Sequence, residues 1–327
     1  MGVLQVAYRY FKRIFREVTK LSAISGYSRY YHLLDYASAY FFHGVHIDQY
    51  TVGNLWRCSN PERSKRITLN RLSRLFRKYN DSSYFHLFRN KEEFNVFFKD
   101  FVHRGWLYIK DAQFDDFKSF VQKYPSVIIK PKDGIQGKGI RRFVYSGEDD
   151  VQLHSLFDEC VAEDALIEET IVQHHGMSFG NASVNTIRVL TVCRPDGKAK
   201  VMKAILRAGV GDSIVDNTAL GGYYYEVDLP TGVVVSKGIN KEGDLCVIHP
   251  SSGIVMLGFK VPHWDKVMQA SLDAARKIPQ VALVGWDVAV TEEGVEIIEG
   301  NDNADYLAYE FIGTSGFYEK ITLFLQE

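Results

Sequence analysis

Several protein classes are excluded by what this sequence of 327 residues lacks. Its four cysteines, Cys58, Cys160, Cys193 and Cys246, lie far apart, and no two of them have the spacing of metal ligands. Scattered single cysteines are typical of a reducing compartment. No apolar run approaches the length that spans a bilayer, and basic residues interrupt the apolar positions near the N-terminus. We therefore expect no transmembrane segment, no signal peptide and a cytoplasmic location.

A large charge of one sign is also missing, because the net charge is −1. No overall field favours nucleic acid, so we expect no nucleic-acid partner. The rest of the composition is ordinary for a globular chain, with 46% hydrophobic and 24% charged residues. The length fits one large domain or two to three small ones.

The most regular pattern lies between residues 284 and 302, where two short apolar runs flank a polar turn. This arrangement predicts a β-hairpin. Asp287 opens the first strand, while Glu299 and Asn301 close the second two positions apart, so their side chains point the same way. Two carboxylates and an amide then converge, a ligand set that Mg²⁺ takes when it also holds nucleotide phosphates. The alternative is a surface hairpin with acidic ends.

A glycine-rich stretch follows an apolar β run that ends at Lys130. Three glycines within six residues let the backbone approach a ligand closely, and two lysines add charge suited to phosphate. These residues are Gly134, Gly137 and Gly139, with Lys130 and Lys138. Because residues 141–145 predict a second strand rather than a helix, we interpret the stretch as a hairpin loop over phosphates and not as a Walker loop. A plain β-turn is the alternative.

Cationic and amide side chains recur on a predicted pair of strands, 186–193 and 201–208. They are Asn185, Arg188, Lys203 and Arg207. Near a metal, these groups indicate an anionic substrate.

The first helix expected, over residues 4–21, combines an apolar stripe with basic residues. The stripe comprises Leu4, Ala7, Tyr8, Phe11, Phe15 and Val18. Two interpretations fit: a helix that packs this stripe on the domain, which we favour, or a basic amphipathic helix on an anionic membrane surface. Residues 27–42 predict a second, more buried helix ended by Gly44, and residues 47–79 a helical, basic stretch with a break at Pro61.

Further along the chain, residues 90–108 predict a helix capped by Asn90, with Phe94, Phe97, Phe98 and Phe101 as its buried stripe. Residues 165–172 predict a strand with two acids at its end. His174 and His175 follow it in a loop. A zinc site there is not favoured, because no third histidine or cysteine stands at a suitable spacing.

The remaining pattern predicts helices at 111–124, 149–161, 264–277 and 318–325, and a further hairpin formed by 223–229 and 233–237.

Taken together, these pieces resemble the ATP-grasp superfamily, and more closely its sugar-transfer-associated branch, found in bacterial polysaccharide gene clusters. The matching segments run in the family's order over roughly residues 85–305. They are Ile129–Ile140, Ser183–Val189, Val215–Gly222, Val227–Gly232, His249–Gly253, Val261–Asp265, Gly285–Ala289 and Ile298–Asn301.

The resemblance implies roles for individual residues. Lys91 and Lys130 match lysines that hold the ATP phosphates, and the segment Gly134–Gly139, with Gln136 and Lys138, matches the mobile loop over them. Glu168, Glu169, Thr170 and Ile171 match the hinge whose backbone reads adenine. Asp287, Glu299 and Asn301 match the Mg²⁺ ligands, and Arg188 an arginine near the transferred phosphoryl group. One departure is that the usual ribose-binding acid is not evident: Gly176 stands about there, and His174 or His175 is the expected substitute.

The resemblance also implies the fold: an α/β ATP-grasp fold that holds the nucleotide between two mixed or antiparallel sheet subdomains, with a helical N-terminal region. We expect four segments. They are a helical region (1–85), a segment carrying the phosphate lysine (86–125), a small subdomain with the glycine-rich loop (126–172) and a large subdomain with the Mg²⁺ site (173–327).

The function implied is an ATP-dependent carboxylate–amine ligase that works through an acyl phosphate. Its cofactors are ATP and Mg²⁺, with two ions expected. Its partners are a small-molecule carboxylate, such as a uronic acid or nucleotide sugar, and an amine. A peripheral contact with a membrane or a glycosyltransferase through the basic N-terminal helix is a weaker expectation. The alternatives are a phosphotransferase acting on a sugar or small molecule, and a non-catalytic ATP-binding partner of a glycosyltransferase.

Overall fold

The computed structural model describes residues 3–132, 139–181, 183–211, 222–240, 242–304 and 316–327. Four residues of the predicted phosphate loop, Gly134, Gln136, Gly137 and Lys138, lie outside these ranges.

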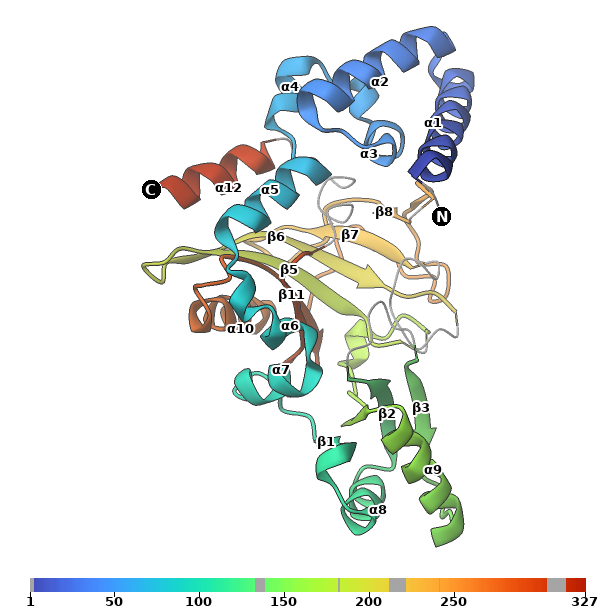
Figure 1. Ribbon diagram of the computed structural model, residues 1–327, viewed down its shortest axis with the longest axis vertical. Coiled ribbons are helices and arrows are strands. Elements are labelled where there is room, and N and C mark those ends of the chain that lie inside the picture. Colours follow the sequence, from blue (N-terminus) through green and yellow to red (C-terminus); the bar gives the residue numbers. More distant parts are fainter. Residues whose placement is uncertain (1–2, 133–138, 182, 212–221, 241, 305–315) are drawn as a thin grey trace.

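The chain begins with a group of helices at one end of the molecule (Figure 1). They are α1 (Val3–Ser25), α2 (Arg29–His43), α3 (Ile47–Thr51), the 3₁₀ turn η1 (Leu55–Arg57), α4 (Asn60–Lys65) and α5 (Leu69–Tyr79). Gly44 ends α2 in the left-handed conformation, with φ of 67°, as predicted. Pro61 does not break a helix but stands in the first turn of α4, where its missing N–H costs nothing.

The expected burial of the first two helices is wrong in part. Val18 and Leu21 of α1 pack in a small core with Tyr36 and Ala39 of α2. The rest of the α1 stripe is exposed at Tyr8, Phe11 and Phe15, and α2 exposes Tyr30, Leu34, Phe41 and Phe42. The periodicity identified an apolar face on each helix, but the domain does not cover most of it.

The next stretch contains η2 (Ser82–Tyr84), α6 (His86–Arg89), α7 (Lys91–Phe97), β1 (Trp106–Tyr108), η3 (Ile109–Asp111) and α8 (Phe114–Lys123). Asn90 caps α7 as predicted by accepting from the backbone N–H groups of Glu92 and Glu93. The single helix expected over 90–108 is wrong, because α7 ends at Phe97 and Trp106 begins a strand. In that strand Trp106 is the register partner of Glu168, so pairing within a sheet overrides the helical periodicity there.

The smaller sheet has four antiparallel strands in the order β1-β4-β2-β3. Its other strands are β2 (Ser126–Pro131), β3 (Arg141–Val144) and β4 (Ala165–Glu169), and α9 (Asp150–Ala162) connects β3 to β4. The strand β4 ends three residues before the predicted end at Val172. Helices α8 and α9 pack on this sheet. Phe117, Val121 and Leu153 of the helices form a core with Val127 of β2 and Ile167 of β4.

The larger sheet has seven antiparallel strands in the order β11-β10-β5-β6-β7-β8-β9. The strands are β5 (Thr186–Cys193), β6 (Ala199–Ala208), β7 (Tyr223–Val227), β8 (Gly238–Ile239), β9 (Leu245–Cys246), β10 (Leu283–Val290) and β11 (Val295–Asn301). The helical elements nearby are η4 (His175–Met177), α10 (Trp264–Lys277) and α12 (Phe317–Gln326). The β10–β11 hairpin, β5 and α10 are close to the predicted ranges. The predicted strand 233–237 makes only isolated bridges, at Val233 and Val234.

The two faces of the larger sheet have different environments. One face carries Ile187, Leu206 and Val288 and packs on α6, α7 and α10. The other carries Leu190, Ile205 and Leu283 and packs on α5 and α12. Because side chains alternate along a strand, Arg188 and Asp287 share the second face. That face is therefore apolar beneath α5 and α12 and charged farther along the strands.

The observed architecture confirms the predicted α/β fold with two antiparallel sheets and a helical N-terminal region. Among the described residues, no helix combines the length and the hydropathy needed to cross a bilayer.

Candidate active site

Three charged side chains stand in one row across the larger sheet. On β10, Asp287 is the register partner of Arg188 on β5 and of Glu299 on β11. Directly opposed residues of antiparallel strands project from the same face at about 5 Å separation. The hairpin thus brings together the two carboxylates that the sequence placed in a metal site.

Gly300 explains how β11 holds this orientation. A Cβ on Gly300 would lie 2.9 Å from atoms of the Phe88 and Trp286 rings, closer than side chains pack. Trp286 is fully buried and donates from its indole nitrogen to Thr191 Oγ1 at 2.9 Å. The absence of a side chain at Gly300 lets both rings fill the apolar face, while Glu299 and Asn301 project from the other.

Asp287 is buried and carries two arginine partners. Both its oxygens accept from Arg188, and Oδ2 lies 2.9 Å from Nη2 of Arg207. Burial acts to raise the pKa of Asp287, but the charges of Arg188 and Arg207 outweigh it and lower the pKa to about 2. Asp287 is therefore an anion at every physiological pH.

Glu299 responds in the opposite direction. Its pKa is raised to about 7, first because the surrounding protein displaces water from the carboxyl and second because Asp287 faces it with a negative charge. The residue remains exposed on one side, so a ligand can reach it. The two arginines lie on Asp287 and leave Glu299 without comparable compensation.

The oxygens of this group suit a divalent cation. A carboxylate has about four acceptor positions. Arg188 and Arg207 use three of those on Asp287, and the carboxyl of Glu299 also lies within hydrogen-bonding reach of Asp287. Asn301 donates from Nδ2 to the carbonyl of Gly285 and to Glu299 Oε1, at 3.2 and 3.3 Å. In the described part of the chain its Oδ1 accepts nothing. Hard oxygen donors on two carboxylates and an amide fit Mg²⁺.

The other predicted catalytic residues occupy different settings. Lys203 is buried on β6 and lies 3.6 Å from Glu226 of β7. The amide of Asn185 is fully used: it donates to the Met177 carbonyl, accepts from Gly209 N–H, and exchanges two hydrogen bonds with Asn181. Asn185 therefore braces the loops at the head of β5 and offers no spare hydrogen-bonding atom.

A second charge cluster joins the two sheets. Its four members are Arg104, Lys130, Glu168 and Glu296, all buried. Glu168 of β4 lies 2.6 Å from Lys130 Nζ and 3.0 Å from Arg104 Nε, and Arg104 Nη1 lies 2.6 Å from Glu296 of β11. Arg104 thus bridges the smaller sheet to the larger one.

The electrostatics of this second cluster are balanced. Burial opposes the ionisation of Glu168, but Arg104 and Lys130 outweigh it and hold its pKa well below the usual range. Burial lowers the pKa of Lys130, although Glu168 opposes the shift, and Glu299 is near enough to act on it as well. The lysine of the smaller sheet therefore lies near the carboxylates of the larger one.

Lys91 lies at the same junction. At the start of α7, its Nζ donates to the carbonyls of Pro131 and Lys132 at 3.0 Å each. It therefore stands where β2 leads into the glycine-rich segment. At the end of that segment Gly139 has φ of 77°, and a Cβ there would lie 2.9 Å from Pro131.

The predicted hinge has two parts. The backbone N–H groups of Glu169 and Thr170 donate to Gly105 and Ser126 and so belong to the sheet. For Ile171 and Val172, no backbone hydrogen bond to another described residue is present. Main-chain groups at 171–172 are thus open to a ligand, whereas the Glu168 side chain is buried in the ion cluster.

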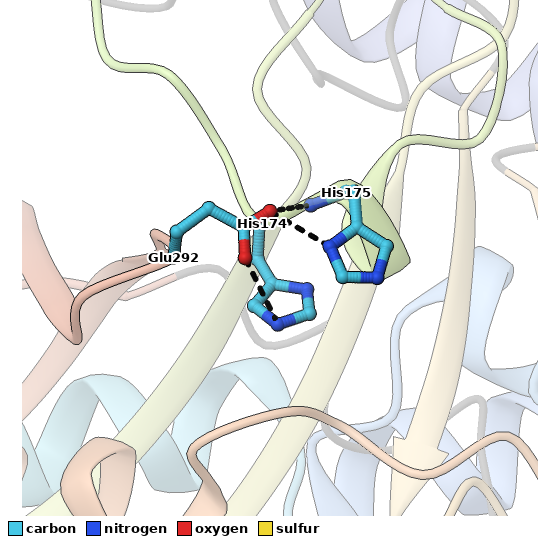
Figure 2. Close-up of side chains that lie close together, drawn as sticks. All are labelled: His174, His175 and Glu292. Atoms are coloured by element: carbon cyan, nitrogen blue, oxygen red, sulfur yellow. Dashed lines mark hydrogen bonds and ion pairs between the residues drawn. The ribbon is translucent and has the colours of Figure 1, made fainter.

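The loop after the hinge contains a cluster that sequence spacing did not suggest. His174 and His175 meet Glu292 from the β10–β11 turn, and their potential ligand atoms all lie within 4.8 Å of one another (Figure 2). A third possible ligand is therefore present, but it is a carboxylate and not the histidine or cysteine considered from the sequence. Gly176 N–H donates to Nδ1 of His174, however, so in the neutral ring Nε2 carries the proton and faces Glu292, at 3.5 Å.

Sequence reasoning missed Arg104, Glu296 and Glu226. Glu296 offered one signal, because it lies in an otherwise apolar strand where a buried charge requires a partner. The partner, Arg104, is 192 residues away in sequence.

A family model described as sugar-transfer associated ATP-grasp matches residues 70–323. Several solved structures are also similar. The ATP-grasp ligase PsnB, complexed with minimal precursor, Mg and ADP, shares 14% identity over 82% of this chain and 70% of its own, with a TM-score of 0.46. N5-carboxyaminoimidazole ribonucleotide synthetase from Thermotoga maritima shares 11% identity over 79% and 55% of the two chains, with a TM-score of 0.44. A biotin carboxylase from Campylobacter jejuni shares 12% over 72% and 46%, with a TM-score of 0.46. No curated protein matches the sequence.

Proposed function

The chain belongs to the sugar-transfer associated ATP-grasp family, and from that membership we propose that it is an ATP-dependent carboxylate–amine ligase. The nucleotide binds between the two sheets, and ATP is converted to ADP and phosphate. The observation that carries the proposal is the row formed by Arg188, Asp287 and Glu299, which places one fixed cation and two carboxylates on one face of the larger sheet.

Asp287, Glu299 and Asn301 hold the divalent cation in this proposal. The direct opposition of the Asp287 and Glu299 carboxyl groups and the raised pKa of Glu299, which a nearby cation would lower, support this assignment. When bound, Mg²⁺ neutralises the charge of the phosphate oxygens and aligns them.

The nucleotide contacts come from both sheets. Lys91 and Lys130 supply fixed positive charge to the phosphates, and Gly134–Gly139 close over them. The adenine is read by the open main chain at 171–172. The ion cluster of Arg104, Glu168 and Glu296 positions Lys130, because Glu168 holds its ammonium group at 2.6 Å.

The reaction has two balanced steps. A carboxylate oxygen of the substrate attacks the γ-phosphorus of ATP, the bond from that phosphorus to the β–γ bridging oxygen breaks, and ADP leaves with that electron pair. The amine nitrogen of the second substrate then attacks the acyl carbon. The carbon–oxygen bond to phosphate breaks, phosphate departs, and the nitrogen releases its proton to phosphate or water.

This chain contributes charge and orientation rather than a nucleophile. Arg188 stabilises the transferred phosphoryl group and the oxyanion of the second step, and one such donor is typically worth ~3 kcal/mol. Asp287 fixes the guanidinium of Arg188 through two hydrogen bonds. Lys203 and Arg207 attract the anionic substrate to the same face, and Asn185 keeps the loops beside β5 in place.

The carboxylate is proposed to be a uronic acid of a nucleotide sugar or glycan, and the amine an amino acid or small amine, in polysaccharide biosynthesis. The family description, sugar-transfer associated, supports this choice.

The test is ADP release by the purified protein with Mg-ATP and a panel of UDP-uronic acids and other carboxylates, with and without pooled amines. Glu299→Gln removes a proposed ligand while keeping the side chain's shape. Glu293→Gln is the matched control, an exposed glutamate in the turn of the same hairpin.

Amine-dependent ADP release that Glu299→Gln abolishes and Glu293→Gln retains supports the ligase. Its product is lighter by one water than the two substrates combined. Turnover indifferent to amine, with a product heavier by one phosphoryl group, identifies a phosphotransferase instead.

A further inference from the structure

The two N-terminal helices carry exposed apolar surface that the ATP-grasp site does not use. Tyr8, Phe11 and Phe15 of α1 are 62%, 71% and 53% exposed. They are three and four residues apart and therefore share one face of the helix. On α2, Tyr30, Leu34 and Phe41 are 75–79% exposed at spacings that again select one face. Isolated exposed apolar residues are common, but an exposed apolar stripe on each of two helices that pack together indicates an interaction surface.

Basic side chains lie directly beside the aromatic stripe of α1. Arg9, Lys12, Arg16 and Lys20 recur every three or four residues. At 3.6 residues per turn, this basic stripe lies roughly 110° around the helix from the aromatic one. The buried residues Val18 and Leu21 occupy the remaining side, which packs on α2. Helix α1 thus has one side for the protein and two exposed sides, one aromatic and one basic.

The charge of this region differs from that of the whole chain. Residues 1–43 contain six basic and two acidic residues, a net charge of +4, whereas the chain totals −1. Both acids are engaged: Asp35 binds Arg63 of α4, and Glu17 lies between Arg16 and Lys20. The side chains of Arg9, Lys12, Arg13 and Arg16 line a common hollow on the surface of α1. An anionic partner is therefore the one that this surface complements.

Helix α2 begins beside the aromatic stripe of α1. The guanidinium of Arg29, the first residue of α2, lies 5.8 Å from the centre of the Phe15 ring on α1. Both helices form the end of the molecule opposite α8 and α9 (Figure 1). They also precede residue 70, where the family match begins, so the family site does not account for them.

We propose that α1 and α2 bind the surface of an anionic lipid bilayer. Aromatic rings beside a row of lysines and arginines are what an interfacial helix requires, since the rings enter the acyl boundary and the cations meet lipid phosphates. Helix α1 lies along the surface, because no described helix is suited to cross a bilayer. The catalytic sheets are thereby held beside the membrane.

The test is co-sedimentation of the full-length protein with vesicles of phosphatidylcholine alone or mixed with phosphatidylglycerol, at low and high salt. We expect binding to the mixed vesicles that salt weakens. Arg9→Gln with Lys12→Gln should lower the partition coefficient about 30-fold, given a typical contribution per basic residue. Tyr8→Ser, Phe11→Ser and Phe15→Ser together should remove binding.

Arg77→Gln with Lys78→Gln is the matched control. It removes the same charge from an exposed site on α5, where the apolar residues Leu72, Leu75 and Phe76 are buried. Circular dichroism and melting temperature establish that each variant is folded.

Three results would overturn the proposal. The first is no binding to anionic vesicles at low salt. The second is an equal loss of binding in the α1 and α5 double variants. The third is a concentration-dependent dimer that the aromatic variant abolishes without vesicle binding, which would make this surface an interface between two copies of the chain.

Discussion

Two charge clusters in this protein have the same number of basic and acidic residues, but their acids differ in how well they are compensated. Each contains two basic and two acidic residues. The cluster at the junction of the sheets comprises Arg104, Lys130, Glu168 and Glu296. The cluster on the face of the larger sheet comprises Arg188, Arg207, Asp287 and Glu299.

The difference lies in how the charges are distributed. In the junction cluster, Arg104 bridges Glu168 and Glu296, and Lys130 adds to Glu168, so each acid has a cation within 3.0 Å. In the sheet-face cluster both arginines lie on Asp287, and Glu299 faces a negative charge, which helps to raise its pKa to about 7. Equal numbers of charges thus give one cluster that is complete and one that lacks a cation. We infer that the first is structural and the second binds a ligand.

The largest effect that we expect to distinguish the two clusters is the loss of folding stability when an acid of the junction cluster is replaced. Glu168→Gln leaves Arg104 and Lys130 buried with less compensation, and we expect the free energy of unfolding to fall by about 3–5 kcal/mol. Urea unfolding followed by circular dichroism measures it. Glu159→Gln on the exposed surface of α9 is the control. A loss below about 1 kcal/mol for Glu168→Gln would show that the junction cluster does not stabilise the fold.

The next effect concerns the sheet-face cluster and is seen in ligand binding. Glu299→Gln should leave stability without ligand nearly unchanged. Saturating Mg-ADP stabilises a protein that binds it, by about 2.7 kcal/mol at 100 times the dissociation constant. We expect Glu299→Gln to lose most of this gain, as measured by the melting temperature with and without Mg-ADP, while Glu293→Gln keeps it. Equal gains in both variants would contradict the assignment of Glu299 as a metal ligand.

A third effect is the pH dependence of the stability that Glu168 contributes. The folded state holds the pKa of Glu168 below its ordinary value of 4.5. Below that value the unfolded chain binds a proton that the folded chain does not, so the stabilisation by Glu168 is present above pH 4.5 and is lost as the pH falls. The stability difference between the parent protein and Glu168→Gln should therefore narrow on acidification, by up to ~1.4 kcal/mol per pH unit. Unfolding at a series of pH values measures it, and a constant difference would show that Glu168 does not titrate in this way.

Whether a contact of these clusters could be predicted from the sequence depends on how far apart its residues lie along the chain. The β10–β11 hairpin and the opposition of Asp287 and Glu299 were predictable, because alternating apolar residues and one short turn fix the register locally. The junction cluster was not, since Arg104 is 64 residues from Glu168 and 192 from Glu296. No local pattern encodes a contact between two sheets.

Helix α1 shows a second limit. Its periodicity correctly indicated an apolar face, but Phe11 and Phe15 lie on a part of it that the described residues leave exposed. Periodicity reports which face is apolar and not what packs against it. Periodicity also failed after α7. The helix predicted over residues 90–108 included Trp106, which instead pairs in a strand.

The smallest effect is expected at a third charged group, which is exposed. Glu292 contacts His174 and His175, but its side chain is 52% exposed and that of His175 is 82% exposed. Exposed ion pairs contribute about 0–1 kcal/mol, so Glu292→Gln should change the free energy of unfolding by less than about 1 kcal/mol.

The same group is not expected to bind zinc. A zinc ion would bind the lone pair of His174 Nε2, yet Gly176 N–H occupies Nδ1 and leaves the proton on Nε2. We therefore expect Zn²⁺ to leave the melting temperatures of the parent protein and of Glu292→Gln unchanged. A zinc-dependent rise found only in the parent would mean that the His174 ring reorients to bind metal, and that exposure alone does not separate ligand-binding from structural charge in this fold.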